Sequence, residues 1–161
     1  MYKTEQLEQV VREERELRFD SFYRQDALRL ARIVYELARE KGAGICCQVV
    51  LEGFEVVRFF LPGTDAGNII WLTRKKNSVM ASGWSSLRCG MEAELNGWHE
   101  PWHEDTENYV IRGGGFPIRE KDGILLGALC ISGLVHYDDH AMCVEALRRL
   151  AREKGAQGAG A

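Results

Sequence analysis

The sequence predicts an α+β fold, with an antiparallel sheet of about five strands flanked by helices. Two pairs of apolar runs are each joined by a short turn, Glu52-Gly53 in the first pair and Asp122-Gly123 in the second. Turns this short connect antiparallel strands, so neither pair is expected to be parallel. Segments with the three- and four-residue apolar spacing of amphipathic helices lie before, between and after the pairs. This alternation predicts helices packed against a sheet of hairpins.

The clearest helical pattern covers residues 24–41. Its apolar residues recur every three or four positions, and Gly42 is placed to end the helix in the left-handed conformation. Asp65 is placed to cap a following helix, and Asp138 or Asp139 to cap the last one. The helices are expected at residues 4–17, 24–41, 65–81, 86–95 and 140–154.

Four runs rich in Val, Ile, Leu and Phe have the composition of strands, and residues 109–112 offer a fifth. We expect the four at residues 45–51, 54–61, 116–120 and 124–133. The chain is expected to form a single domain over residues 1–154. Residues 155–161 have no large apolar side chain, so we expect a flexible tail there.

Composition and charge exclude several classes of protein. The 161 residues include 21 basic and 24 acidic ones, for a net charge of −3, whereas a nucleic-acid-binding protein normally carries a basic excess. The longest uncharged apolar stretch, residues 124–135, is too short for a membrane span, which needs about 20 residues. The five cysteines form no C-x-x-C pair, so we expect free, buried thiols in a cytoplasmic protein.

The sharpest local feature is a run of three glycines between Arg112 and the pair Phe116-Pro117. Glycines can adopt positive φ and let backbone N–H groups approach a ligand closely, which would suit an anion or a flat molecule. The same run would also suit a strand entry at which sheet and helix backbones meet. Both interpretations stay open for the three residues Gly113, Gly114 and Gly115.

A second candidate binding feature is the charged run that begins at Arg74 on the third expected helix. Arg74 or Lys75 would grip a carboxylate, and Asn77 on the same face as Arg74 would complete the hydrogen bonds. The alternative is a solvated helix face. Ser132, at the end of a buried strand, would lie near the start of the last helix and add a hydroxyl group.

The four histidines form two pairs with H-x-x-x-H spacing. Pro101 interrupts the pair of His99 and His103, and His136 is expected to precede the last helix that carries His140. No H-E-x-x-H motif is present, so we expect no metal site. No set of nucleophile, base and oxyanion donors assembles in the sequence, which favours a role without catalytic turnover.

An ordered series of motifs along most of the chain resembles the UPF0303 family, a branch of the haem-degrading-domain proteins. The motifs lie at residues 22–28, 61–64, 71–79, 85–86, 113–118, 131–134 and 139–140. The resemblance implies a profilin-like antiparallel sheet flanked by helices, assembled into a homo-oligomer. It implies no single activity.

The chain departs from the family pattern at two places. Arg112 stands where the family favours a histidine, and Ser82-Gly83-Trp84 stands where it favours an aromatic residue and histidines. An arginine can pair with a haem propionate but cannot ligate iron.

The leading hypothesis is a ligand-binding module in a homo-oligomer, for a small anionic or planar molecule with haem among the candidates. Its groove would be lined by Arg74, Asn77, Arg112, Gly113, Gly114, Gly115, Phe116, Pro117 and Ser132. The alternative is a non-enzymatic oligomeric scaffold that presents surfaces, such as Trp98 and Trp102, to protein partners. A third hypothesis is a metal-dependent enzyme that uses His136, Asp139 and His140.

Overall fold

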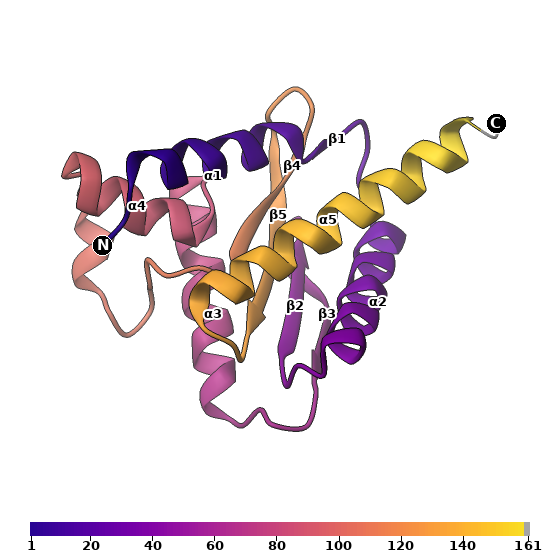
Figure 1. The fold of residues 1–161 in the computed structure, drawn as a ribbon, viewed down its shortest axis with the longest axis horizontal. Coiled ribbons are helices and arrows are strands. Elements are labelled where there is room, and N and C mark those ends of the chain that lie inside the picture. The colour runs from indigo at the N-terminus through magenta and orange to yellow at the C-terminus, as the bar shows by residue number, and fades with distance from the viewer. Residues whose placement is uncertain (160–161) are drawn as a thin grey trace.

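A computed structural model describes the backbone of residues 1–159 and the side chains of residues 1–155. It contains one five-stranded sheet between layers of helices (Figure 1). The helices are α1 (Thr4–Glu16), α2 (Arg24–Lys41), α3 (Gly67–Ser82), α4 (Ser86–Asn96) and α5 (His136–Ala159), with a short 3-10 helix η1 (Pro101–Glu104). The strands are β1 (Arg18–Phe19), β2 (Cys46–Leu51), β3 (Phe54–Phe60), β4 (Gly115–Glu120) and β5 (Leu125–Ser132).

The strand order is β1-β4-β5-β2-β3. Both expected hairpins, β2–β3 and β4–β5, are confirmed as antiparallel, and β2 also pairs antiparallel with β5. The α+β prediction with about five strands is therefore confirmed, but the sheet is mixed. The short strand β1 runs parallel to β4, with Arg18 opposite Arg119. No tight turn links β1 to β4, so turn length did not restrict their relative direction.

The fifth strand is β1 and not residues 109–112, which form no strand. In that segment the backbone N–H of Val110 donates to Oγ of Ser78 on α3, at 3.0 Å. A side chain of the neighbouring helix thus takes the place that a strand partner would occupy.

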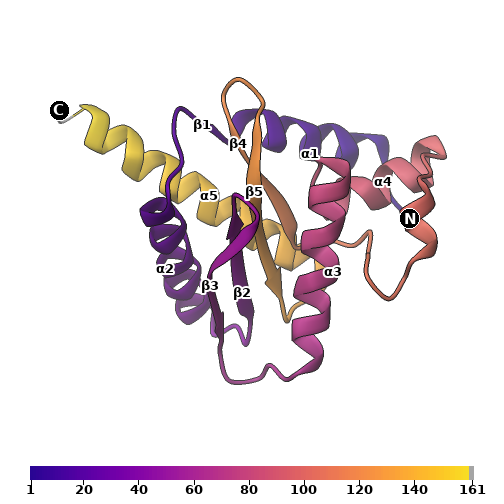
Figure 2. The ribbon, with the colours of Figure 1, turned by 180° about the vertical axis from the view of Figure 1, so that it is seen from behind.

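Two helix layers enclose the sheet (Figures 1 and 2). Helices α2 and α5 pack against one face and form the main core there. Helix α3 covers part of the opposite face, where its buried Leu72 and Val79 meet Cys46 and Cys130. Helices α1 and α4 pack together beside the sheet around Val10. The middle of α3, the first turn of α5 and the entry to β4 meet at one point, where Gly114 lies close to Lys75 and Asp139.

Local sequence signals set several boundaries as expected. Helix α2 has the predicted bounds and ends at Gly42, which has a φ of 62°. The N-cap of α3 is Ala66 and not the expected Asp65, but Oδ1 of Asp65 accepts a hydrogen bond of 2.8 Å from the N–H of Gly67 at the start of the helix. Ser85 caps α4 by accepting from the N–H of Arg88. These signals are contained within a few residues, which is why the sequence carries them.

Helix α5 differs from the prediction at both ends. It begins at His136, not at residue 140, because the carbonyl of Val135 accepts the N–H groups of Asp138 and Asp139 and so starts the helix earlier. At the other end it continues to Ala159, so residues 155–159 of the expected tail are helical. The remaining tail residues, 160–161, lie outside the described range.

All five cysteines are free and buried, as expected. Cys46 packs in the cluster beneath α3, and Cys47 packs in the main core on the other face of the sheet. Successive side chains of a strand point to opposite faces, which explains this division. No helix within residues 1–159 is long and apolar enough to cross a membrane.

Candidate functional site

The three glycines lie where β4 enters the sheet between α3 and α5. A methyl group at Gly114 would overlap the carbonyl oxygen of Ile131 and lie 2.5 Å from Nζ of Lys75, and one at Gly115 would lie 2.8 Å from Val79. Gly114 also has a φ of 122°, which glycine tolerates best. The run therefore allows strand and helix backbones to approach closely.

Two of the three glycine N–H groups already have partners. Gly113 donates to Nδ1 of His136 at 3.1 Å, and Gly115 donates to Oγ of Ser86 at 2.9 Å. Phe116 and Pro117, which follow, are buried in the sheet. In this structure the run is thus a packing element that also holds the ring of His136 in place.

A buried ion pair lies directly beside this run. Nζ of Lys75 on α3 is 2.9 Å from Oδ2 of Asp139 on α5, and it also donates to the carbonyl oxygen of Ile131 at 2.9 Å. The other carboxylate oxygen of Asp139 accepts from the N–H of Leu134. Burial raises the pKa of Asp139, while the charge of Lys75 acts in the opposite direction. The pair joins α3, β5 and α5 at one point.

His136 lies next to this pair and has a fixed tautomer. Because its Nδ1 accepts a hydrogen bond from the N–H of Gly113, the neutral ring carries its proton on Nε2. Burial lowers the pKa of His136, and the positive charges of Arg112 and Lys75 add to the effect. At neutral pH His136 is therefore an uncharged ring with an Nε2–H donor.

A second histidine, His140, is buried and connects α5 to α1. Nε2 of His140 lies 2.9 Å from Oε1 of Glu13. Burial works against ionisation of Glu13, but the hydrogen bond and the charge of His140 outweigh it, so the pKa of Glu13 is lowered. This contact links α1 to α5. Neither Glu13 nor His140 lines the two hollows near the start of α5.

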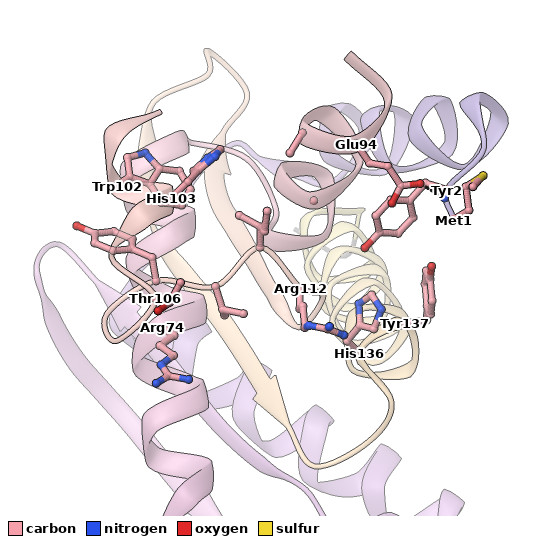
Figure 3. Close-up of a pocket in the computed structure, with 15 residues that line it drawn as sticks. Met1, Tyr2, Arg74, Glu94, Trp102, His103, Thr106, Arg112, His136 and Tyr137 are labelled. Atoms are coloured by element: carbon pink, nitrogen blue, oxygen red, sulfur yellow. Dashed lines mark hydrogen bonds between the residues drawn. The ribbon is translucent and has the colours of Figure 1, made fainter. Parts of the chain in front are cut away.

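The larger of two neighbouring hollows has a volume of about 750 Å³ and opens between α4, the segment after η1 and the start of α5 (Figure 3). Trp102 and Tyr109 lie on one side with their rings 5.0 Å apart, and Tyr2 and Tyr137 lie on the other, 6.0 Å apart. The remaining charged and titratable side chains in its wall are Arg74, Glu94, His103, Arg112 and His136.

The smaller hollow has a volume of about 380 Å³ and lies beside the first. It is lined by Asn68, Trp71, Lys75, Arg112, Ser132, Gly133, Leu134, Val135, His136 and Asp139. Arg112 and His136 belong to both walls, so they form the ridge between the two hollows.

The structure brings only some of the predicted site residues together. Arg74 lines the larger hollow, Ser132 the smaller, and Arg112 both. Asn77 lines neither, because its side-chain amide donates to the carbonyl of Asn108 and fastens the loop to α3. The glycines and Phe116-Pro117 lie beneath the hollows and are not in either wall.

The sequence analysis missed the pairing of Lys75 with Asp139. Lys75 shares one face of α3 with the buried Leu72 and Val79, three and four positions away. A lysine on the apolar face of a helix requires a buried partner, and this spacing is the signal that would have indicated it.

The structure bears on two further hypotheses, a metal site built from histidines and a partner surface built from Trp98 and Trp102. Among the described residues, no three histidine, cysteine or acidic side chains lie close enough to hold a metal ion. Trp98 and Trp102 are half-buried, with ring centroids 5.8 Å apart, and His103 packs against both. The aromatic surface that a scaffold would present is therefore partly covered.

With the fold and hollows described, comparison with known proteins gives the family. The model of the family described as "haem degrading protein HbpS-like" matches residues 22–148. The chain belongs to this family. Its curated relatives include UPF0303 proteins of Rhizobium etli, 36% identical over 88% of this chain and 87% of the relative, and of Streptomyces coelicolor, 33% identical over 88% and 90%. The resemblance to UPF0303 proteins is thus confirmed.

Solved structures of related proteins agree with this assignment. The Ybr137w protein has a TM-score of 0.83 and 26% identity, and the match covers 94% of this chain and 91% of that protein. A PduOC–haem complex has a TM-score of 0.68 and 22% identity, with coverage of 80% and 94%. These neighbours confirm the profilin-like fold of the family.

Proposed function

We propose that this member of the HbpS-like family is a binding module for a planar molecule that carries carboxylate groups, and that the larger hollow is its site. The observation that carries the proposal is the combination of aromatic walls with two arginines in one hollow of ligand size. Binding sites for small molecules are typically about 300–1,000 Å³ and mostly apolar, with a few polar groups that orient the ligand.

The aromatic side chains would contact the faces of a flat ligand. Trp102 and Tyr109 on one side and Tyr2 and Tyr137 on the other leave the hollow between them (Figure 3). Aromatic rings favour stacked or edge-to-face contacts with other rings. A ligand with an extended π-system therefore suits this wall better than an aliphatic one.

The two arginines would bind the carboxylates. The side chain of Arg112 forms no hydrogen bond or ion pair with any of residues 1–155, whose side chains the structure describes. Arg74 uses its Nε to hold the carbonyl of Glu107, which leaves its terminal nitrogens available. A guanidinium group forms two parallel hydrogen bonds with a carboxylate, so each arginine can fix one end of an anionic ligand.

Haem is the first ligand to test, because the matched family and the PduOC–haem neighbour both point to it. Its propionates fit the two arginines, but neither histidine of the hollow offers an open Nε2 for iron. Nε2 of His136 carries the ring proton, and Nε2 of His103 is buried against the surrounding rings. We therefore propose binding through the ring faces and propionates, without axial histidine ligation.

The test is an absorbance titration of the purified protein with haemin. We expect a saturable shift of the Soret band at a defined stoichiometry, and an unchanged band position in His103→Ala. Replacing Arg112 or Arg74 by alanine should weaken binding about 10- to 100-fold, the effect of losing a charge-assisted hydrogen bond of about 1.5–3 kcal/mol. Arg32→Ala, an exposed arginine on α2, is the matched control.

A shift no larger than that given by an unrelated protein would remove haem from the proposal. Equal binding by the Arg112→Ala, Arg74→Ala and Arg32→Ala variants would show that the larger hollow is not the site. The titration thus tests the identity of the ligand and the location of its binding site separately.

We also propose that the protein is a cytoplasmic homo-oligomer. Helix α3 exposes Ile69, Ile70 and Met80, and the edge strand β3 exposes Phe60 nearby in sequence. Neighbouring exposed apolar side chains favour contact with another subunit. The five free thiols fit a reducing compartment. Light scattering coupled to gel filtration tests the assembly, and Ile70→Asp should lower the measured mass if α3 lies in the interface.

A further inference from the structure

We propose that the smaller hollow is a separate binding site, for a small monocarboxylate with a short apolar body. Its volume of about 380 Å³ lies at the small end of the range of ligand sites. It shares only Arg112 and His136 with the larger hollow. The two proposals share Arg112, but the floor and most of the wall of the smaller hollow come from residues that do not line the larger one.

The floor of the hollow is the ammonium group of Lys75. This residue is only 2% exposed, and its Nζ donates to Ile131 and Asp139. An ammonium group has three N–H donors, and among residues 1–155 the third has no partner. A buried charged donor without a partner is costly. A carboxylate oxygen in the hollow would complete the set.

Further donors surround the same space. Arg112 brings a guanidinium group that has no other partner in the described chain. Asn68 uses one amide hydrogen on Oγ of Ser132, at 3.3 Å, so the Ser132 hydroxyl is free to donate its own proton. Lys75, Ser132 and Arg112 come from α3, β5 and the segment before β4, so a ligand would contact three parts of the fold.

The charge balance selects a monoanion. Asp139 already neutralises Lys75 inside the hollow, and His136 is neutral at pH 7, so Arg112 leaves a formal charge of about +1. A single carboxylate would balance this charge. A doubly charged phosphate would bring excess negative charge close to the buried Asp139, which is unfavourable at short range.

The side chains at the mouth of the hollow favour an apolar group next to the carboxylate of the ligand. Its wall there is formed by Trp71, Leu134 and Val135, which offer apolar contacts and no charge. The volume of about 380 Å³ admits an apolar body of several carbon atoms. Propionate satisfies both conditions and is the probe that we would use.

The experiment is a titration of the ¹⁵N-labelled protein with sodium propionate, at constant ionic strength, followed by NMR. We expect saturable shifts of the Trp71 indole and of the backbone amides of residues 132–136. Inorganic phosphate should bind about tenfold more weakly or worse, a difference of about 1.4 kcal/mol. Absence of a saturable propionate response, or equal binding of phosphate, would overturn the proposal.

Position 135 offers a matched pair of variants. Val135 immediately precedes α5, and both aspartate and asparagine are favourable residues at a helix N-cap, so both variants should fold. Val135→Asp adds a negative charge at the mouth and should weaken propionate binding about tenfold, whereas Val135→Asn should change it less than about threefold. Equal losses would contradict charge selection.

The two hollows can be tested separately with the same variants. Trp102 lines only the larger hollow and Val135 only the smaller. Trp102→Ala should weaken haemin binding and leave propionate binding intact, and Val135→Asp should do the reverse. In the unsubstituted protein, absence of haemin binding with intact propionate binding would disprove only the proposed function, and absence of propionate binding with intact haemin binding would disprove only this inference.

Discussion

The substitution Gly114→Ala tests whether the glycine run is a packing element. The added methyl would overlap the carbonyl oxygen of Ile131 and lie 2.5 Å from Nζ of Lys75 and 3.0 Å from Cβ of Asp139. A non-glycine residue in such a sparsely populated backbone region costs about 1–3 kcal/mol. Overpacking of a filled interior costs about another 1–3 kcal/mol. We expect the free energy of unfolding to fall by about 2–6 kcal/mol, a large part of the usual total of about 5–15 kcal/mol.

Urea unfolding followed by circular dichroism measures this loss. With a slope of about 2 kcal/mol per molar urea, the middle of the usual range, the midpoint should fall by about 1–3 M. Gly42→Ala is the matched control, because Gly42 also has a positive φ but no atom lies within 4 Å of the added methyl. Backbone strain alone should cost the control about 1–2 kcal/mol. If Gly114→Ala proves no more destabilising than Gly42→Ala, the close-packing explanation of the run is wrong.

Three further predictions concern buried titratable groups. Burial lowers the pKa of His136 below its ordinary 6.5, so as the pH falls the imidazole of the unfolded chain is protonated before that of the folded protein. The free energy of unfolding should therefore fall as the pH drops through 6.5. The urea midpoint of His136→Asn should depend less on pH. Lys75→Met should cost about 3–5 kcal/mol by leaving Asp139 unpaired, and adding Asp139→Asn should recover part of it in thermal unfolding. Burial raises the pKa of Cys46 to about 11 and of Cys130 to about 12, so a thiol reagent at neutral pH should label the five cysteines only after unfolding, and rapid labelling of the native protein would contradict the packing.

Features that depend on neighbouring residues could be predicted from the sequence. The apolar spacing over residues 24–41 and the glycine that follows gave the bounds of α2, and the two short turns gave both hairpins. The motif series gave the family, and hence the fold. In each case the information lies within one element or in the order of motifs along the chain.

The candidate site could be predicted only in part, for a physical reason. Arg74, Arg112 and Ser132 were identified by residue type, and all three line hollows. Their division between two hollows depends on how α3 and α5 approach each other, which no local pattern encodes. The glycine run pointed to a close approach of backbones, but the sequence did not say whether the approaching group would be a ligand or a helix.

The sequence alone determined the α+β class, the approximate positions of the helices, the hairpins and the family, because those depend on local spacing, turn chemistry and the order of motifs. Tertiary structure alone decided the parallel pairing of β1 with β4, the early start of α5 and the burial of Lys75 against Asp139. Lys75 and Asp139 are 64 positions apart, and only packing of α3 and α5 around the glycine run brings them to 2.9 Å. Contacts of this kind arise from the arrangement of finished elements, so they are absent from any short stretch of sequence.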